Sequence, residues 1–285
     1  VVAVFDPDPA CRGAVEQGGW RALVTGEEEQ AWGREADAAL VCSPSVYHLG
    51  QARRAVAKGL HVFIEKPLSP TLDQTEALVV EAAAAGRVVL VGCNLRFFPS
   101  LRRVKRLLDE GLVGRPLSAR AQCGYYLPYW RPNTDYRNGY GARRAVGGGV
   151  ILDSIHEFDY LSWMLGEPVE VFAYAGKVSS LEIDTEDNAD VLIRFASGAV
   201  ASVHLDYLQR TYRRSCELIG EEGVIVWDYI TQAVTVYGKQ DRRCEVFTES
   251  INAERNQMYV QEMKHFARSI AGEEQPLLDA AGGRA

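Results

Sequence analysis

The sequence predicts an α/β protein: a doubly wound parallel sheet, followed by an α+β domain with an open, mostly antiparallel sheet. Up to about residue 97, short uninterrupted apolar runs alternate with helix-like segments. This pattern is typical of strands buried on both faces of a parallel sheet. Beyond that point, long strand candidates joined by hairpin-like links dominate. We therefore expect two domains, 1–97 and 98–285.

The first domain is expected to hold strands at 1–6, 38–45, 61–64 and 87–94. Helices are expected between them at 47–58 and 71–85, where Gly59 and Gly86 provide the stops. In the second domain a helix at 100–110 ends at Gly111. Two further helices are expected at 150–165 and 252–271, and strands at 117–126, 169–178, 188–196, 199–208, 214–219, 223–229 and 232–237.

Composition excludes several classes of protein. Of the 285 residues, 47% are hydrophobic and 24% are charged, and the net charge is −7. An acidic chain offers no broad basic surface to nucleic acid, and its apolar runs are too short to span a bilayer. The six cysteines are widely spaced and form no CxxC pair, which is typical of reduced thiols in a cytoplasmic protein.

The stretch "HVFIEKPLSP" (61–70) reads as a core strand that stops at a charged pair. Lys66 would lie at the carboxyl end of that strand, the edge of a doubly wound sheet where ligands bind. Its ammonium can hydrogen-bond a substrate hydroxyl and stabilise negative charge on the oxygen, while Pro67 fixes the backbone. The alternative is an ordinary Glu–Lys pair on a surface loop.

Asp6 ends the first strand. An acid at such a position in a dinucleotide fold accepts from the adenosine ribose hydroxyls and repels a 2′-phosphate, which favours NAD over NADP. The alternative is a turn aspartate before Pro7. The glycine motif GxGxxG that normally precedes this acid is not in the chain.

A second group of polar residues follows three glycines, in the helix expected at 150–165. Asp153, His156 and Tyr160 share one face of a continuous helix, and a carboxylate one turn from a histidine can orient its ring. The alternative is an ordinary polar helix face. A metal site formed by Asp153, His156 and Asp159 is not expected, because these positions drift around the helix.

The segment "YYLPYWRPNTDYRNGYGARR" (125–144) is rich in tyrosine and arginine. It is long enough to fold over a substrate. Arginine suits a phosphate or carboxylate, and aromatic rings suit a sugar face. We expect Tyr126, Arg131 and Tyr136, together with Tyr160, to contact the substrate; the alternative is a surface loop packed on its own tyrosines.

Taken together, "EKP", "NLRFFP" (94–99) and "GGG…D..H..D" resemble the glucose–fructose oxidoreductase and inositol dehydrogenase (Gfo/Idh/MocA) family. The resemblance extends from "VVAVFDPDP" to "ELIGEEGVIVWD" (217–228) and lies in the order and spacing of the motifs. It implies a Rossmann-type NAD(P)-binding domain at 1–97 and a substrate and oligomerisation domain at 98–285. It also implies that sequence is missing at both ends, including the first strand and its glycine loop.

By this resemblance, Lys66 and His156 are the catalytic pair. Asp153 is their partner, three residues before the histidine instead of the commoner four. The family would place the cofactor beside Asp6, Ser43, Pro44, His48, Glu65, Lys66, Asn94 and Arg96.

The implied activity is reversible hydride transfer between nicotinamide and a hydroxyl-bearing carbon of a sugar, sugar nucleotide or cyclic polyol, with NAD as cofactor. The family further implies a homo-oligomer, a dimer or a tetramer. Two alternatives stay open: an NAD-dependent glycosidase of the same fold, and a catalytically silent relative that binds a sugar or nucleotide.

Overall fold

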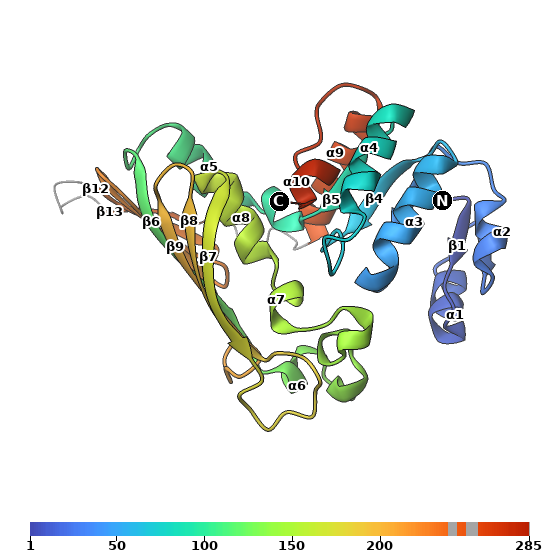
Figure 1. The fold of residues 1–285 in the computed structure, drawn as a ribbon, viewed down its shortest axis with the longest axis horizontal. Helices are drawn as coiled ribbons and strands as arrows, with labels where there is room; N and C mark the ends of the chain where they lie inside the picture. The colour runs from blue at the N-terminus through green and yellow to red at the C-terminus, as the bar shows by residue number, and fades with distance from the viewer. Residues whose placement is uncertain (239–243, 249–255, 285) are drawn as a thin grey trace.

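The structure, a computed structural model, describes residues 1–238, 244–248 and 256–284 (Figure 1). It confirms the predicted order of a parallel sheet followed by a mostly antiparallel one. The parallel strands form two separate sheets. One pairs β1 (Ala3–Phe5) with β2 (Leu23–Thr25), and the other holds β3 (Ala38–Val41), β4 (His61–Glu65) and β5 (Val89–Gly92) in that order.

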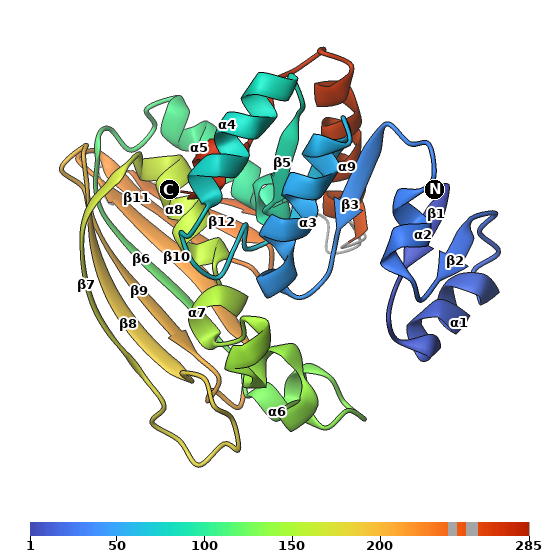
Figure 2. The same ribbon diagram turned by 45° about the vertical axis from the view of Figure 1, so that its right-hand side comes forward.

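The division of the parallel strands lies between β1 and β3 (Figure 2). Leu40, in the edge strand β3, is 58% exposed. Three elements of this region fall outside the sequence expectation: β2, α1 (Pro9–Gln17) and α2 (Glu28–Trp32). Neither of these helices buries a residue, so the periodic apolar signal that marks a packed helix is weak in both.

The three-stranded sheet is covered by α3 (Ser45–Ala57) and α4 (Thr75–Ala85). Val62 and Ile64 of β4 are fully buried against Ala52 and Leu78 of these helices. Gly86 ends α4 in the left-handed conformation, with φ of 62°, as the sequence predicts. This packing fixes the carboxyl end of β4, where Lys66 follows.

The second sheet has eight strands within the described residues, in the order β13-β12-β11-β10-β6-β9-β8-β7. All neighbours are antiparallel except β6 and β9. Along β8 buried and exposed residues alternate, as in a sheet with one covered face. The strands are β6 (Pro116–Gly124), β7 (Pro168–Gly176), β8 (Asn188–Phe195), β9 (Val200–Asp206), β10 (Arg213–Gly220), β11 (Gly223–Asp228), β12 (Ala233–Gly238) and β13 (Cys244–Thr248), the last not expected from the sequence.

The helix expected at 150–165 is broken in two. It forms α7 (Val150–Asp153) and α8 (His156–Leu165), with Ser154 between them at φ −100° and ψ 33°. With α5 (Pro99–Asp109), α8 covers one face of the second sheet, and the short α6 (Leu127–Trp130) lies beyond its lower end (Figure 1). The break changes the relative direction of Asp153 and His156.

The last two helices return to the first sheet. Phe266 of α9 (Asn256–Ile270) packs edge-on against Phe63, with ring centroids 5.9 Å apart. The Val91 amide donates to the carbonyl of Leu278 at 2.9 Å, just before α10 (Ala280–Arg284). Figure 1 shows both helices beside β5. The predicted domain boundary after residue 97 therefore stays a prediction. The strands follow it, but the C-terminal helices α9 and α10 pack against the parallel sheet of the first domain. Of the expected helix at 252–271, residues 252–255 lie outside the described residues.

Candidate active site

Lys66 connects the parallel sheet to α7. Its Nζ donates to the main-chain oxygen of Asp153 at 2.6 Å and lies 3.5 Å from the Asp153 carboxylate. The two side chains remain 19% and 17% exposed, so solvent and small ligands can reach them. Lys66 therefore stands where the two halves of the molecule meet, and the following peptide bond to Pro67 is cis.

His48 ties together the loops after β3 and β4. One ring nitrogen lies 2.7 Å from the oxygen of Pro67, and the other lies 2.7 Å from the oxygen of Ser43. The side chain is 1% exposed, so it stabilises the two loops from within the protein and is not accessible to a ligand. Ser43 in turn donates its hydroxyl to Gln51 at 2.7 Å. The loop 43–48 is thus held rigidly beside Lys66.

Asp153 does not orient His156, which corrects the sequence expectation. One carboxylate oxygen accepts from the Tyr207 hydroxyl at 3.0 Å, and the other faces Lys66. Nδ1 of His156 is buried without a hydrogen-bond partner among the described residues. The break at Ser154 is the physical reason, because the two side chains no longer lie on one continuous helix face.

His156 itself lies within the protein at 7% exposure. Burial, and then the positive charges of Lys66 and Arg214, lower the pKa of its imidazole well below the usual value of 6.5. The ring is therefore neutral at neutral pH and can accept a proton. Because Nδ1 is enclosed, Nε2 is the nitrogen that can meet a ligand.

A buried ion pair lies beside His156 and was not found from the sequence. Arg214 of β10 approaches the Glu157 carboxylate at 2.9 Å, and Glu157 has no exposed surface. Burial raises the pKa of Glu157, and the charge of Arg214 opposes that rise. The pair brings a fixed cation next to the neutral imidazole of His156.

Two of the predicted ligand residues serve packing. The guanidinium of Arg96 donates to the Asp159 carboxylate at 2.8–3.1 Å and to the Leu277 oxygen at 2.6 Å. Tyr160 is fully buried, with its ring edge-on to Trp227 at 5.7 Å. These contacts argue against direct roles for Arg96 and Tyr160 in ligand binding.

A small pocket of about 90 Å³ opens beside Asp153. Its walls come mostly from the tyrosine- and arginine-rich segment and include Arg131 and Tyr136, whose contact with the substrate stays a prediction. Tyr126 is not among its lining residues and stacks under Arg210, 3.6 Å from ring centroid to guanidinium carbon. The full lining is Leu127, Trp130, Arg131, Thr134, Tyr136, Gly139, Tyr140, Gly141 and Asp153.

The other predicted cofactor residues follow the carboxyl ends of parallel strands. Asp6 follows β1, and one of its carboxylate oxygens accepts from the Asp8 amide at 2.8 Å. Glu65 ends β4, where burial raises its pKa against the charge of Lys66. Asn94 opens the 3₁₀ turn after β5. Polar groups at these strand ends, together with the accessible Lys66, fit the nicotinamide end of a dinucleotide.

The described residues offer neither a metal site nor a membrane span. No group of three or more His, Cys, Asp or Glu side chains there could hold a metal ion. No helix in that part of the chain is long and apolar enough to cross a membrane.

Two family profiles match the chain in sequence. Residues 1–93 match "Oxidoreductase family, NAD-binding Rossmann fold", and residues 101–226 match "GFO/IDH/MocA C-terminal domain". A 1,5-anhydro-D-fructose reductase of Ensifer adhaerens is 32% identical over 206 residues, which cover 71% of this chain and 60% of the reductase. A myo-inositol 2-dehydrogenase of Thermotoga maritima is 29% identical over 257 residues, 87% of this chain and 73% of that enzyme.

Solved structures share the fold. A levoglucosan dehydrogenase in complex with NADH and levoglucosan superposes with a TM-score of 0.88 at 21% identity, covering 99% of this chain and 84% of that one. The chain spans 60% of the length of the related 1,5-anhydro-D-fructose reductase. Since consecutive profiles of one family match both halves, the chain belongs to the Gfo/Idh/MocA oxidoreductase family.

Proposed function

We propose that the protein is an NAD-dependent dehydrogenase that transfers a hydride between nicotinamide and a hydroxyl-bearing carbon of a sugar or cyclic polyol. The contact of Lys66 Nζ with Asp153, beside the neutral His156, carries the proposal. It unites a cation, a carboxylate and a base where the two sheets meet. The names of the relatives, an anhydrofructose reductase and inositol dehydrogenases, support this substrate class.

The residues divide the work as follows. NAD, when bound, accepts the hydride, and the protein supplies position and charge. Lys66 donates a hydrogen bond to the substrate hydroxyl and stabilises the negative charge that grows on its oxygen. His156 takes the hydroxyl proton on Nε2. Asp153 holds the Lys66 ammonium toward this point.

The cofactor would lie along the loop 43–48, with Asn94 and Glu65 near the nicotinamide and Asp6 near the adenosine ribose. The substrate would lie against Arg131 and Tyr136. A sugar ring has an apolar face that matches the aromatic walls of the pocket, including Trp130. Its hydroxyls would face Arg131 and the polar centre at Lys66.

A screen of sugars, sugar nucleotides and inositols with NAD tests the proposal. We expect NADH to accumulate in proportion to the substrate consumed, measured as the absorbance at 340 nm. The Asp6 carboxylate should make kcat/KM larger with NAD than with NADP. A glycosidase of this fold would release a leaving group without net NADH, and a silent binding protein would bind sugar without turnover; either result would refute the proposal.

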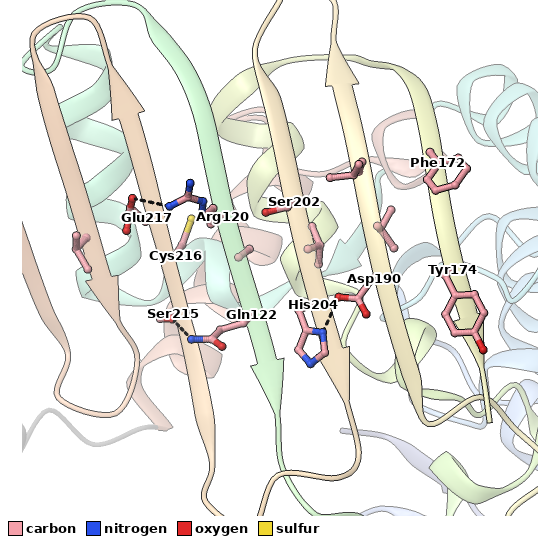
Figure 3. A pocket seen from close by; sticks show the side chains of 15 residues that line it. Arg120, Gln122, Phe172, Tyr174, Asp190, Ser202, His204, Ser215, Cys216 and Glu217 are labelled. Carbon is pink, nitrogen blue, oxygen red and sulfur yellow. Dashed lines mark hydrogen bonds and ion pairs between the residues drawn. The ribbon is translucent and has the colours of Figure 1, made fainter. Parts of the chain in front are cut away.

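We also propose that the exposed face of the eight-stranded sheet binds a second copy of the chain. Figure 3 shows the side chains of this face from close by. A hollow of about 610 Å³ lies across its strands. Phe172 is 75% exposed on it, and Tyr174 and Leu192 are exposed as well. Apolar patches of this kind mark interaction sites. A broad sheet face can meet its own copy about a two-fold axis.

The centre of this face is charged. His204 lies 2.7 Å from Asp190, as Figure 3 shows, and its other ring nitrogen lies 3.1 Å from Asp206. The hydrogen bonds that the His204 ring donates to these carboxylates, above all to Asp206, outweigh burial and raise the pKa of His204 to about 9. At neutral pH the positive charge of the imidazolium is therefore compensated by carboxylates of its own subunit.

Phe172→Glu is expected to convert the oligomer to a monomer, because it places a carboxylate in the apolar part of the contact, on the edge strand β7. Light scattering after size-exclusion chromatography measures the mass. Val80→Glu, at an exposed position on α4, should leave the mass unchanged. A monomeric wild-type protein, or equal masses for all three, would contradict the dimer.

The location expected from the cysteines also remains a proposal. Within the described residues Cys11, Cys42, Cys93, Cys123 and Cys216 are free thiols. Free thiols, of which Cys11 and Cys42 are exposed, are typical of a reducing compartment such as the cytoplasm.

A further inference from the structure

Tyr207 makes a contact in the candidate site that the sequence did not single out. It directly follows β9, and its side chain has no exposed surface. Its hydroxyl donates to Oδ2 of Asp153 at 3.0 Å. The partner carboxylate is the one that faces Lys66, so Tyr207 lies one hydrogen bond behind the proposed catalytic centre.

The ring of Tyr207 is fixed on several sides. Trp130 packs against it at 5.4 Å with the ring planes perpendicular. The Tyr207 amide donates to the Asp187 oxygen at 2.9 Å, and its carbonyl accepts from the Leu127 amide at 3.1 Å. A tyrosine held in this way has little freedom to turn its hydroxyl away from Asp153.

A glycine backbone covers the hydrogen bond. A β-carbon at Gly141 would lie 2.8 Å from the Tyr207 hydroxyl and 3.0 Å from Asp153 Oδ2. Such a carbon would crowd both atoms, so glycine suits the position. The Gly141 carbonyl accepts from the Thr185 hydroxyl at 2.9 Å and the Gly149 amide at 3.1 Å. Fixed backbone and the fully buried Tyr207 side chain therefore enclose the hydroxyl end of the bond.

The direction of the hydrogen bond is set by chemistry. An ionised carboxylate accepts only. Burial, and then the Asp153 carboxylate, raises the pKa of the Tyr207 phenol well above its usual value, so the hydroxyl keeps its proton. Oδ2 is thereby held by a neutral donor, and Oδ1 is left directed at the Lys66 ammonium.

We propose that Tyr207 is a positioning residue of the active site, which acts on Lys66 through Asp153. The inference rests on the proposed function, because it assigns Tyr207 a part in holding the cation used there. It is not itself a catalytic residue, since its hydroxyl is directed at Asp153 and the side chain is enclosed.

Tyr207→Phe is expected to lower kcat for NAD-dependent sugar oxidation by about 10- to 100-fold, the range for loss of one hydrogen bond to a charged group. KM for NAD should change little. In the Asp153→Ala background the same substitution should cost nothing further, because its partner is already gone. Tyr212→Phe is the control, since the Tyr212 ring packs on Tyr125 and Tyr229.

A second readout does not depend on turnover. Labelling of Lys66 by an acylating reagent, followed by mass spectrometry, should be several-fold faster in Tyr207→Phe and in Asp153→Ala, because a loosely held amine reacts more readily. The double variant should match Asp153→Ala. The role of Tyr207 would be overturned if Lys66 in Tyr207→Phe were labelled at the wild-type rate. It would also be overturned if the losses of kcat in Tyr207→Phe and Asp153→Ala added up in the double variant. Absence of NADH formation by the wild-type chain would overturn the proposed function, while the labelling result would still decide the inference.

Discussion

Lys66→Ala is expected to lower kcat by on the order of 10²–10⁴-fold, the range typical for a group that assists proton transfer or stabilises charge. The ammonium lies 3.5 Å from the Asp153 carboxylate and keeps partial exposure, so it can reach a substrate oxygen. Alanine removes the positive charge that, in the proposed mechanism, stabilises the negative charge developing on the substrate oxygen. The dissociation constant for NAD, measured by fluorescence titration, should change only a few-fold.

Lys66→Arg should not restore activity, because a planar guanidinium cannot replace a compact ammonium at one oxygen between fixed partners. Lys58→Ala, at the exposed end of α3, is the matched control and should retain wild-type kcat. Near-normal turnover of Lys66→Ala in an active wild-type background would refute the proposed role. A parallel loss of NAD affinity would instead assign Lys66 to cofactor binding.

The parts of the fold that follow from local patterns were predicted well. β3, β4 and β5 are short apolar runs between helices, and burial of β4 and β5 within the sheet favours such uninterrupted apolar runs. β2 was missed because it is three residues long and precedes a helix with no buried residue. Its pairing with β1 joins residues that are 20 positions apart in sequence, which local patterns do not encode.

The candidate site divides in the same way. Lys66 could be found because a strand end, a charge and a proline are adjacent in sequence. The break between α7 and α8 could not, because the apolar spacing runs on through Ser154 without a proline or glycine. Arg214 and Tyr207 reach the site from β10 and the end of β9, 57 and 54 residues from their partners Glu157 and Asp153. Such contacts depend on the order of the strands in the folded sheet, which local sequence patterns do not reveal.

His156→Ala is expected to lower kcat by about 10²–10⁴-fold and to change the pH dependence of the reaction. A base must be neutral to accept a proton, so activity falls as pH drops through its pKa. Burial and the nearby cations lower the pKa of His156 well below 6.5. In the oxidation direction, the acid limb of kcat/KM for the wild-type protein should therefore lie below pH 6.5, and this limb should be lost in His156→Ala.

The ion pair beside His156 allows a sharper test. Arg214→Met combined with Glu157→Leu removes a cation near the ring without leaving a buried unpaired charge. Without the nearby cation, the charged form of His156 costs less, so the pKa of the ring rises and the acid limb should move to higher pH. Burial still keeps this pKa below that of an exposed histidine. Asp190→Asn, on the far face of the sheet, should leave the limb in place. An acid limb that stays fixed in the double variant, or that survives in His156→Ala, would mean that another group accepts the proton.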